Sequence, residues 1–314
     1  MNTSLPVEEK PRKWMAVGLT SLVALLLIAW AIYGIGEYGL ALFVITPLFI
    51  GGCSAVIYAY KRAVSCRAVV QTGFWSLGLC MVLLMACAME GLICIVMALL
   101  PAILLTWVGS LLGYALVRKT PGKTPLAVLL LTCSIPSLSF IEKSYPPSLN
   151  AVTTSVEIKA TPETVWRHVI AFPQLPEPTA FIFKTGIAYP VNATITGEGV
   201  GAVRHCNFNT GSFVEPVTAW KEARLLKFDV AEQPAPLKEL SFWDVKAPHL
   251  HDYFVSKQGQ FRLIPLPNGN TLLEGTTWYY HNIKPAFYWR QWSTFIIHKI
   301  HQRVLEHIKQ QAEK

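Results

Sequence analysis

Five long apolar runs in the first half of the sequence constrain its fold more than any other feature. They cover residues 14–35, 38–60, 69–88, 91–117 and 125–141. A helix needs roughly 18 or more apolar residues to cross the hydrocarbon core of a bilayer, and the first four runs exceed that length. The fifth run, at about 17 residues and with Pro136 near its end, stands at the short limit. We therefore expect a transmembrane helical region over residues 1–145 with about five spans.

The charged residues between the runs predict an orientation. Basic clusters occupy every second connection, whereas the alternate connections carry only Glu37 and Glu90. Lys and Arg near span ends are retained on the cytoplasmic side, so the N-terminus should be cytoplasmic. If all five runs cross, the C-terminal half lies outside the cytoplasm; if the fifth lies in the interface, that half is cytoplasmic. The basic clusters are Lys10, Arg12 and Lys13; Lys61, Arg62 and Arg67; and Arg118, Lys119 and Lys123.

The second half of the sequence has a different composition. Residues 150–314 contain seventeen basic and fourteen acidic residues and all eight histidines, against ten basic and five acidic residues in 1–149. Residues 1–149 therefore carry +5 of the net charge of +8, and residues 150–314 carry +3. The second half is not basic enough to indicate nucleic acid, and we expect no nucleic-acid partner. We expect a second, water-soluble domain over residues 150–314.

This domain begins with the stretch VEIKATPETVWRHVIAF, residues 156–172. Val156 and Ile158 alternate with polar residues, which is the period of a half-buried strand. Thr161 followed by Pro162 is typical of a helix N-terminus, with threonine at the N-cap and proline at the first helical position. Val165, Trp166, Val169 and Ile170 then recur at helical spacing. The stretch predicts a strand that leads directly into an amphipathic helix.

The rest of the domain has the pattern of six strands and one long helix. The strand-like segments are 190–197, 200–210, 212–220, 224–231, 253–265 and 271–282, and 266–270 (LPNGN) is typical of a hairpin turn. A helix from 285 to about 312 follows. We predict an α+β helix-grip domain, a curved antiparallel sheet around the C-terminal helix, after an all-α transmembrane bundle. Its buried stripe should contain Trp289, Trp292, Ile296, Ile300, Val304 and Ile308.

Residues 151–314 resemble the SRPBCC superfamily, which includes START lipid-transfer domains, the birch-pollen allergen family and polyketide cyclase-like proteins. The stretch 156–172 is similar to the usual beginning of these domains, and LEGTTWYY at 273–280 resembles their last strand. Elsewhere the resemblance rests on the order of the elements, and it does not extend to the apolar runs. It implies a deep cavity between sheet and helix for an apolar ligand such as a lipid, sterol or polyketide.

The aromatic content of the second half independently favours such a pocket. We expect ligand contacts from Phe228, Phe261 and Trp278 on the concave face of the sheet, and from Trp292 and Ile296 on the helix stripe that faces it. Packing in an ordinary core is the alternative for each of these residues. Residues 238–253 read as an inserted loop in which Phe242 and Trp243 could form a lid.

Residues that could carry chemistry are sparse. No phosphate loop, dinucleotide fingerprint, Gly-x-Ser-x-Gly or Cys-x-x-Cys motif is present. His249, His251 and Asp252 could suggest zinc, but further ligands are not identifiable, so we expect no metal and no cofactor. We expect His298 and His301 to lie on the polar, solvated side of the last helix. Glu198, Arg204 and Glu274 could orient a ligand head group, although exposed strand faces explain them more simply.

These observations predict an integral protein of the bacterial inner (plasma) membrane whose extracytoplasmic domain binds a hydrophobic small molecule or lipid. We expect a binding protein rather than an enzyme. Two alternatives stay open: a cyclase-like or hydrolytic enzyme that acts on a lipophilic substrate, and an interaction module with a filled core. A buried acid/base pair inside the cavity would favour the enzyme.

Overall fold

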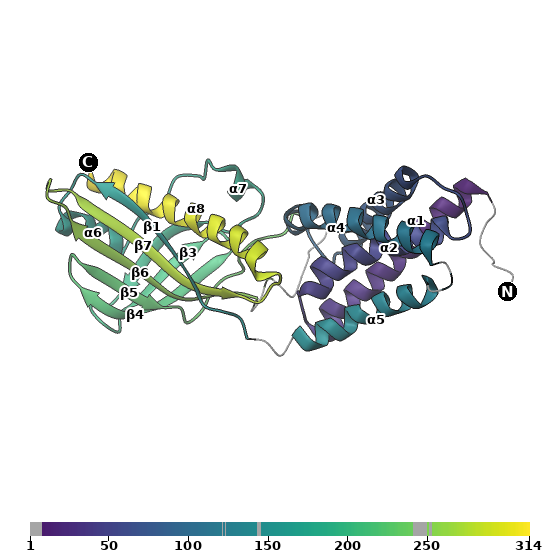
Figure 1. The fold of residues 1–314 in the computed structure, drawn as a ribbon. Helices are drawn as coiled ribbons and strands as arrows, with labels where there is room; N and C mark the ends of the chain where they lie inside the picture. The colour runs from purple at the N-terminus through teal and green to yellow at the C-terminus, as the bar shows by residue number, and fades with distance from the viewer. Residues whose placement is uncertain (1–7, 121, 123, 143–145, 241–249, 251–252) are drawn as a thin grey trace. The chain divides into compact units, whose positions relative to one another are not determined.

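A computed structural model describes residues 8–120, 122, 124–142, 146–240, 250 and 253–314. By contacts the chain divides into two compact units. The first contains the N-terminal helices together with Glu239, Leu240 and Ile283–Pro285, and the second contains the sheet and the remaining helices. Each unit is described by itself (Figure 1).

The first unit consists of helices that follow the five apolar runs. Two of them include π-helical turns, at Trp30–Ile35 and Ala41–Ile45. Within the described residues, four helical segments are long and apolar enough to cross a membrane: Glu9–Ile35, Ala41–Ala59, Cys66–Ala86 and Leu92–Lys119. The fifth run forms a helix whose apolar stretch, Leu126–Glu142, is shorter. The α-helices are α1 (Glu9–Ala29), α2 (Thr46–Ala59), α3 (Cys66–Ala86), α4 (Leu92–Lys119) and α5 (Thr124–Glu142).

Many small and hydroxylated residues lie in the interior of this unit, beside a few large ones such as Phe49 and Tyr58, and large apolar residues cover its outside. Ser21 Oγ donates to Ser76 O at 2.8 Å in the buried interior, whereas Leu100 and Leu112 are more than 60% exposed. Helices α2 and α4 approach closely: a Cβ at Gly51 would lie 2.1 Å from Thr106 O. Small residues at close crossings and interhelical hydrogen bonds from hydroxyl groups are typical of helices that pack within a bilayer.

The second unit is built on a seven-stranded antiparallel sheet in the order β1-β7-β6-β5-β4-β3-β2. Each predicted segment forms a strand, and the hairpin predicted at 266–270 joins β6 to β7 through Leu266 N–H donating to Asn270 O at 2.8 Å. The strands are β1 (Asn150–Ile158), β2 (Pro190–Thr196), β3 (Val203–Phe208), β4 (Gly211–Lys221), β5 (Leu225–Asp229), β6 (Phe254–Pro265) and β7 (Thr271–His281).

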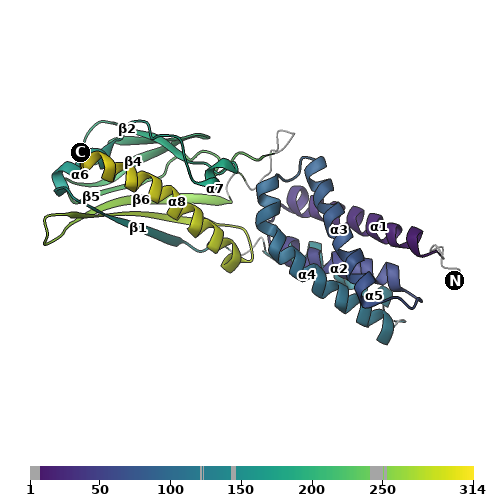
Figure 2. The same ribbon diagram turned by 90° about the horizontal axis from the view of Figure 1, so that it is seen from above.

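Three helices accompany the sheet. Helix α6 (Pro162–Ile170) begins as predicted, with Thr161 at the N-cap position, although its hydroxyl lies 3.4 Å from Thr164 Oγ1 and caps no backbone group. A short helix, α7 (Phe181–Lys184), was not predicted. The long helix α8 (Ala286–Ala312) crosses one face of the sheet in both views (Figure 1 and Figure 2). This arrangement confirms the predicted helix-grip fold.

The buried stripe of α8 differs from the prediction in its first half. Trp289, Val304 and Ile308 are buried as expected, whereas Ile300 is only partly buried. Ser293 and Ile297 take the places predicted for Trp292 and Ile296, which are also only partly buried. Ser293 and Ile297 both contact Tyr279 of β7. Compared with the prediction, the helix is therefore turned about its axis so that a mixed polar and apolar face contacts the sheet. A search for a purely apolar stripe cannot find such a face.

Candidate functional site

The face of the sheet that packs on α8 is the concave side of the domain. On β7, Thr277 Oγ1 lies 2.8 Å from His301 Nε2 of α8, and Tyr279 OH lies 2.8 Å from Ser293 Oγ. Successive strand residues point to opposite faces, so Gly275 shares this face and Trp278 does not. Strand pairing extends the concave face to the strands beside β7.

Two of the predicted contact residues lie on the concave face. Phe228 of β5 is buried, and its ring centroid lies 6.3 Å from that of Phe261 on β6. Both rings belong to the apolar core or pack against it. The prediction that these two side chains point inward is confirmed, while their contact with a ligand stays a prediction.

Trp278 was expected on the same face, and this expectation is wrong. Its ring lies on the outer side of the sheet, where Lys227 Nζ lies 5.3 Å from the ring centroid. The inward position of β7 beside Phe261 is taken by Gly275, so the alternation of the strand turns Trp278 outward. Trp292 and Ile296 lie beside the buried stripe of α8 rather than on it. Phe242 and Trp243, the predicted lid, lie outside the described residues.

The concave face carries a buried charged pair, Arg204 and Glu215. Arg204 of β3 lies directly opposite Glu215 of β4, its guanidinium donates to the Glu215 carboxylate, and Arg204 is 2% exposed. Its Nε also donates to Ile170 O at 3.3 Å. A buried charge of this kind is tolerated only when it is paired and hydrogen-bonded.

Three aromatic rings surround the guanidinium of Arg204. Its Cζ lies 5.7 Å from the ring centroid of Phe172, 5.3 Å from that of Phe228 and 5.6 Å from that of Phe261. An arginine near aromatic faces gains a cation–π attraction that increases when water is excluded. The concave face thus presents an apolar aromatic lining with one charged pair at its centre.

The electrostatics of this pair follow from burial. Burial raises the pKa of the Glu215 carboxyl, and Arg204 opposes that shift. Burial also raises the pKa of the neighbouring Cys206 thiol to about 12, so this cysteine is not a reactive thiolate at neutral pH. Because Arg204 occupies the Glu215 carboxylate, the pair is better suited to hold a polar group than to remove a proton.

A second polar group joins α8 to β1 and β7. Thr154 Oγ1 lies 2.7 Å from His298 Nδ1 and 3.1 Å from His301 Nδ1. Burial, and next the charge of His298, lowers the pKa of His301 to about 4. The expectation that both histidines lie on a solvated helix face is therefore wrong, because His301 faces the sheet.

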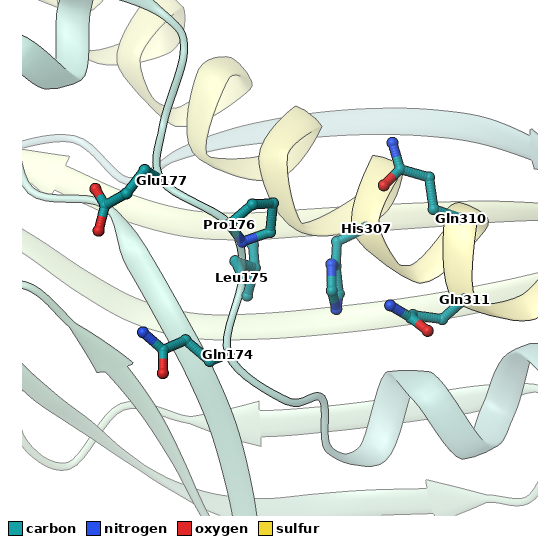
Figure 3. Close-up of a pocket in the computed structure, with 7 residues that line it drawn as sticks. All are labelled: Gln174, Leu175, Pro176, Glu177, His307, Gln310 and Gln311. Carbon is teal, nitrogen blue, oxygen red and sulfur yellow. The ribbon is translucent and has the colours of Figure 1, made fainter.

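A pocket opens where the segment after α6 passes the last turns of α8 (Figure 3). It has a volume of about 490 Å³, within the range of small-molecule sites. His307 lines it and is only 6% exposed, and the ring centroid of His307 lies 6.1 Å from that of Phe172. Phe172 also contacts Arg204, so this aromatic ring separates the pocket from the charged pair.

In the described part of the first unit, one group of side chains that could ligate a metal ion lies close together. One donor atom each from Glu90, Cys94 and Glu239 lies within 4.8 Å of the others. The cluster lies at the N-terminus of α4, where a Cβ on Gly91 would come 1.8 Å from Glu239 Oε2. A helix N-terminus itself favours carboxylates, which accounts for the cluster without a metal ion. His249, His251 and Asp252 lie outside the described residues.

The sequence did not point to Glu215 or His307, and for Arg204 it left two positions open: an inward one beside a ligand head group, and an exposed strand face as the simpler explanation. Arg204 and Glu215 each stand at an inward position of their strands, and the pairing of β3 with β4 makes them direct partners. The available signal was the alternation with the apolar residues Cys206 and Val217 at the neighbouring inward positions. Glu198 is exposed, and Glu274 faces outward and pairs with Arg262 at 2.6 Å.

Comparisons with known proteins concern the second unit. Residues 150–282 match the family model described as polyketide cyclase/dehydrase and lipid transport. No curated protein sequence matches the chain.

Similar solved structures include XoxI from Bacillus cereus, at 18% identity and TM-score 0.34 over 51% of this chain and 93% of that one. Norcoclaurine synthase from Thalictrum flavum, solved with a transition-state analogue, is 13% identical, with TM-score 0.35 over 54% of this chain and 97% of that one. The Aha1 dimer from Colwellia psychrerythraea is 16% identical, with TM-score 0.30 over 51% of this chain and 96% of that one. Residues 150–282 thus match an SRPBCC-type family model, that of polyketide cyclase/dehydrase and lipid transport, and the second unit has the helix-grip architecture.

Proposed function

We propose that the chain is a membrane-anchored protein that binds a hydrophobic small molecule or lipid between the sheet and α8. The observation that carries the proposal is the set of inward rings of Phe172, Phe228 and Phe261 around one buried guanidinium. An apolar lining with few convergent polar groups is what small-molecule sites use. The family of the domain includes lipid transport in its description.

The apolar helices support the anchoring part of the proposal. Their large exposed apolar side chains would meet lipid, and their small interior residues pack against one another. Residues 143–149 join α5 to β1 and span at most about 25 Å when fully extended. The binding domain is thereby kept near the bilayer, where apolar ligands are concentrated. We place the N-terminus in the cytoplasm and, with five crossings, the binding domain outside it.

Binding is favoured over catalysis by the state of the buried carboxylate. Glu215 is engaged by Arg204 and would have to be released before it could act as a general base. A polar head group that enters the aromatic lining could instead hydrogen-bond to the pair. A cyclase-like activity on a lipophilic substrate remains the second candidate, because burial raises the pKa of Glu215, as it does for many catalytic carboxyl groups.

Native mass spectrometry of the full chain, released from detergent micelles, tests the proposal. We expect one apolar molecule to stay bound after loosely attached lipids are removed. A Gly275→Phe variant should lose it, because a Cβ at this position lies 3.6 Å from Leu305 Cδ2 and 3.7 Å from Phe261 Cε1, so the added ring would fill the space between sheet and helix.

Trp278→Ala is the matched control, because Trp278 lies on the outer face of the same strand and its loss should leave the bound molecule in place. Thermal unfolding of each variant verifies that the domain stays folded. A parent chain that emerges without any bound molecule would contradict the proposal and favour an interaction module with a filled core. Retention of the molecule by folded Gly275→Phe would place it elsewhere.

A further inference from the structure

The pocket beside the end of α8 contains a buried nitrogen without a partner. Nε2 of His307 is inaccessible to solvent and has no hydrogen-bond partner among the described residues, although the ring lines a pocket of about 490 Å³. A buried polar atom left unpaired costs roughly 1–3 kcal/mol, so native proteins rarely keep one without a reason. The ring lines the adjacent pocket, so a small rotation of the His307 side chain would let a ligand there supply the missing partner.

The walls of the pocket are fixed by contacts outside it. Arg303 of α8 donates from Nη2 to Pro176 O at 2.5 Å and from Nε to Pro190 O at 3.0 Å. Leu175 N–H donates to Val191 O at 2.7 Å, which ties the same segment to β2. These hydrogen bonds hold the 174–177 segment at a set distance from α8, so the pocket is preformed.

The polar side chains around the pocket are mostly uncharged. Gln174, Gln310 and Gln311 contribute amides, each able to donate and to accept, and Glu177 contributes an acceptor (Figure 3). Leu175 and Pro176 form the apolar part of the wall. Burial, and next the positive charges of Lys314, Arg303 and His168, lowers the pKa of His307, so its ring is neutral at pH 7.

This combination selects the chemistry of the ligand. The pocket is surrounded by charges of both signs, from Glu177 on its wall and from Arg303 and Lys314 near the His307 ring, so its charge favours neither an anion nor a cation. A hydroxyl group both donates and accepts, so it can bond to His307 Nε2 whichever ring nitrogen carries the proton. Several hydroxyl groups on one ligand would also match the three amides.

We propose that the pocket lined by residues 174–177, His307, Gln310 and Gln311 is a binding site for a neutral, hydroxyl-rich group such as a polyol or a sugar. The group could be a free small molecule or the head group of a lipid. The inference does not depend on the apolar ligand of the proposed function, because every residue that carries it lies outside the aromatic lining.

Isothermal titration of the full chain in phosphatidylcholine nanodiscs tests this site. The probes are methyl β-glucoside and a short-chain, water-soluble glucosyl diacylglycerol, with glycerol 3-phosphate and ethanolamine as charged comparators. We expect both glucosyl probes to bind and neither comparator to bind as tightly. Equal affinity for the two glucosyl probes would indicate a free ligand, and at least tenfold tighter binding of the lipid would indicate a head group.

His307→Phe should weaken binding of the glucosyl probes roughly tenfold, the loss expected for one hydrogen bond in a buried site. Gln310→Ala provides a second variant on an exposed residue that cannot unfold the helix, and it should weaken binding several-fold. Gln302→Ala, another exposed glutamine of α8 outside the pocket, should bind as the parent does. The inference is overturned if neither glucosyl probe binds, if a charged comparator binds more tightly, or if His307→Phe and Gln310→Ala both bind like the parent.

Discussion

Arg204 and Glu215 face each other across β3 and β4, and both side chains are buried on the concave face of the sheet. Glu215→Gln should lower the free energy of unfolding by about 3–5 kcal/mol, because it leaves the buried guanidinium without its counter-charge. The double variant Arg204→Met, Glu215→Leu should cost less than the single change, because no charge remains buried. Chemical unfolding of the full chain in detergent measures both. A double variant as unstable as the single one would show that the pair contributes by packing alone.

Two inward glycines of neighbouring strands should respond differently to alanine. A Cβ at Gly259 would lie 2.4 Å from Phe228 Cε2, whereas a Cβ at Gly275 meets its nearest neighbour at 3.6 Å. Gly259→Ala should therefore cost about 1–3 kcal/mol by overpacking, and Gly275→Ala should be nearly neutral. Thermal unfolding compares the two variants, and Phe228→Leu should partly rescue Gly259→Ala. Equal costs for the two alanines would mean that Phe228 does not pack on β6 as described.

The stability of the domain should depend on pH through His301. Its folded pKa of about 4 lies below the ordinary value of 6.5, so between these values the folded state binds fewer protons than the unfolded chain. The contribution of His301 is full above pH 6.5 and is lost as the pH falls toward 4, by about 2 kcal/mol for this partly exposed group. His301→Gln should flatten this part of the pH profile. If the pH dependence of the free energy of unfolding is the same in His301→Gln as in the parent, groups other than His301 cause it.

The proposed topology predicts where the C-terminus lies. With the N-terminus in the cytoplasm and five crossings, a tag placed after Lys314 should react with a membrane-impermeant reagent in intact cells. A second tag in the basic connection at Lys61 should react only after the cells are opened. If the C-terminal tag is also protected, α5 does not cross and the binding domain is cytoplasmic.

Much of the fold could be predicted because it depends on local patterns. The apolar runs determine where α1–α5 lie, and alternation with hairpin signals such as 266–270 locates the strands to within a few residues. The short helix α7 was missed, since its four residues carry no periodicity that a sequence can reveal.

The site was less predictable because it depends on pairing between distant segments. That Trp278 points outward follows from the position of Gly275 beside Phe261, which is known only once the β6–β7 register is known. Arg204 is buried because Glu215 lies opposite it, and a lone arginine in a strand more often indicates a solvated face. The rotation of α8 toward Ser293 reflects its hydrogen bond to Tyr279, a polar contact that no apolar stripe predicts.

Photolabelling of the full chain in vesicles by a fatty acid that carries a diazirine group tests the central claim most directly. The account predicts that, besides the membrane helices, peptides containing Phe228 and Phe261 are labelled, and that Gly275→Phe removes this labelling while Trp278→Ala preserves it. Labelling confined to α1–α5 in the parent chain would contradict the claim that the second unit holds an apolar ligand.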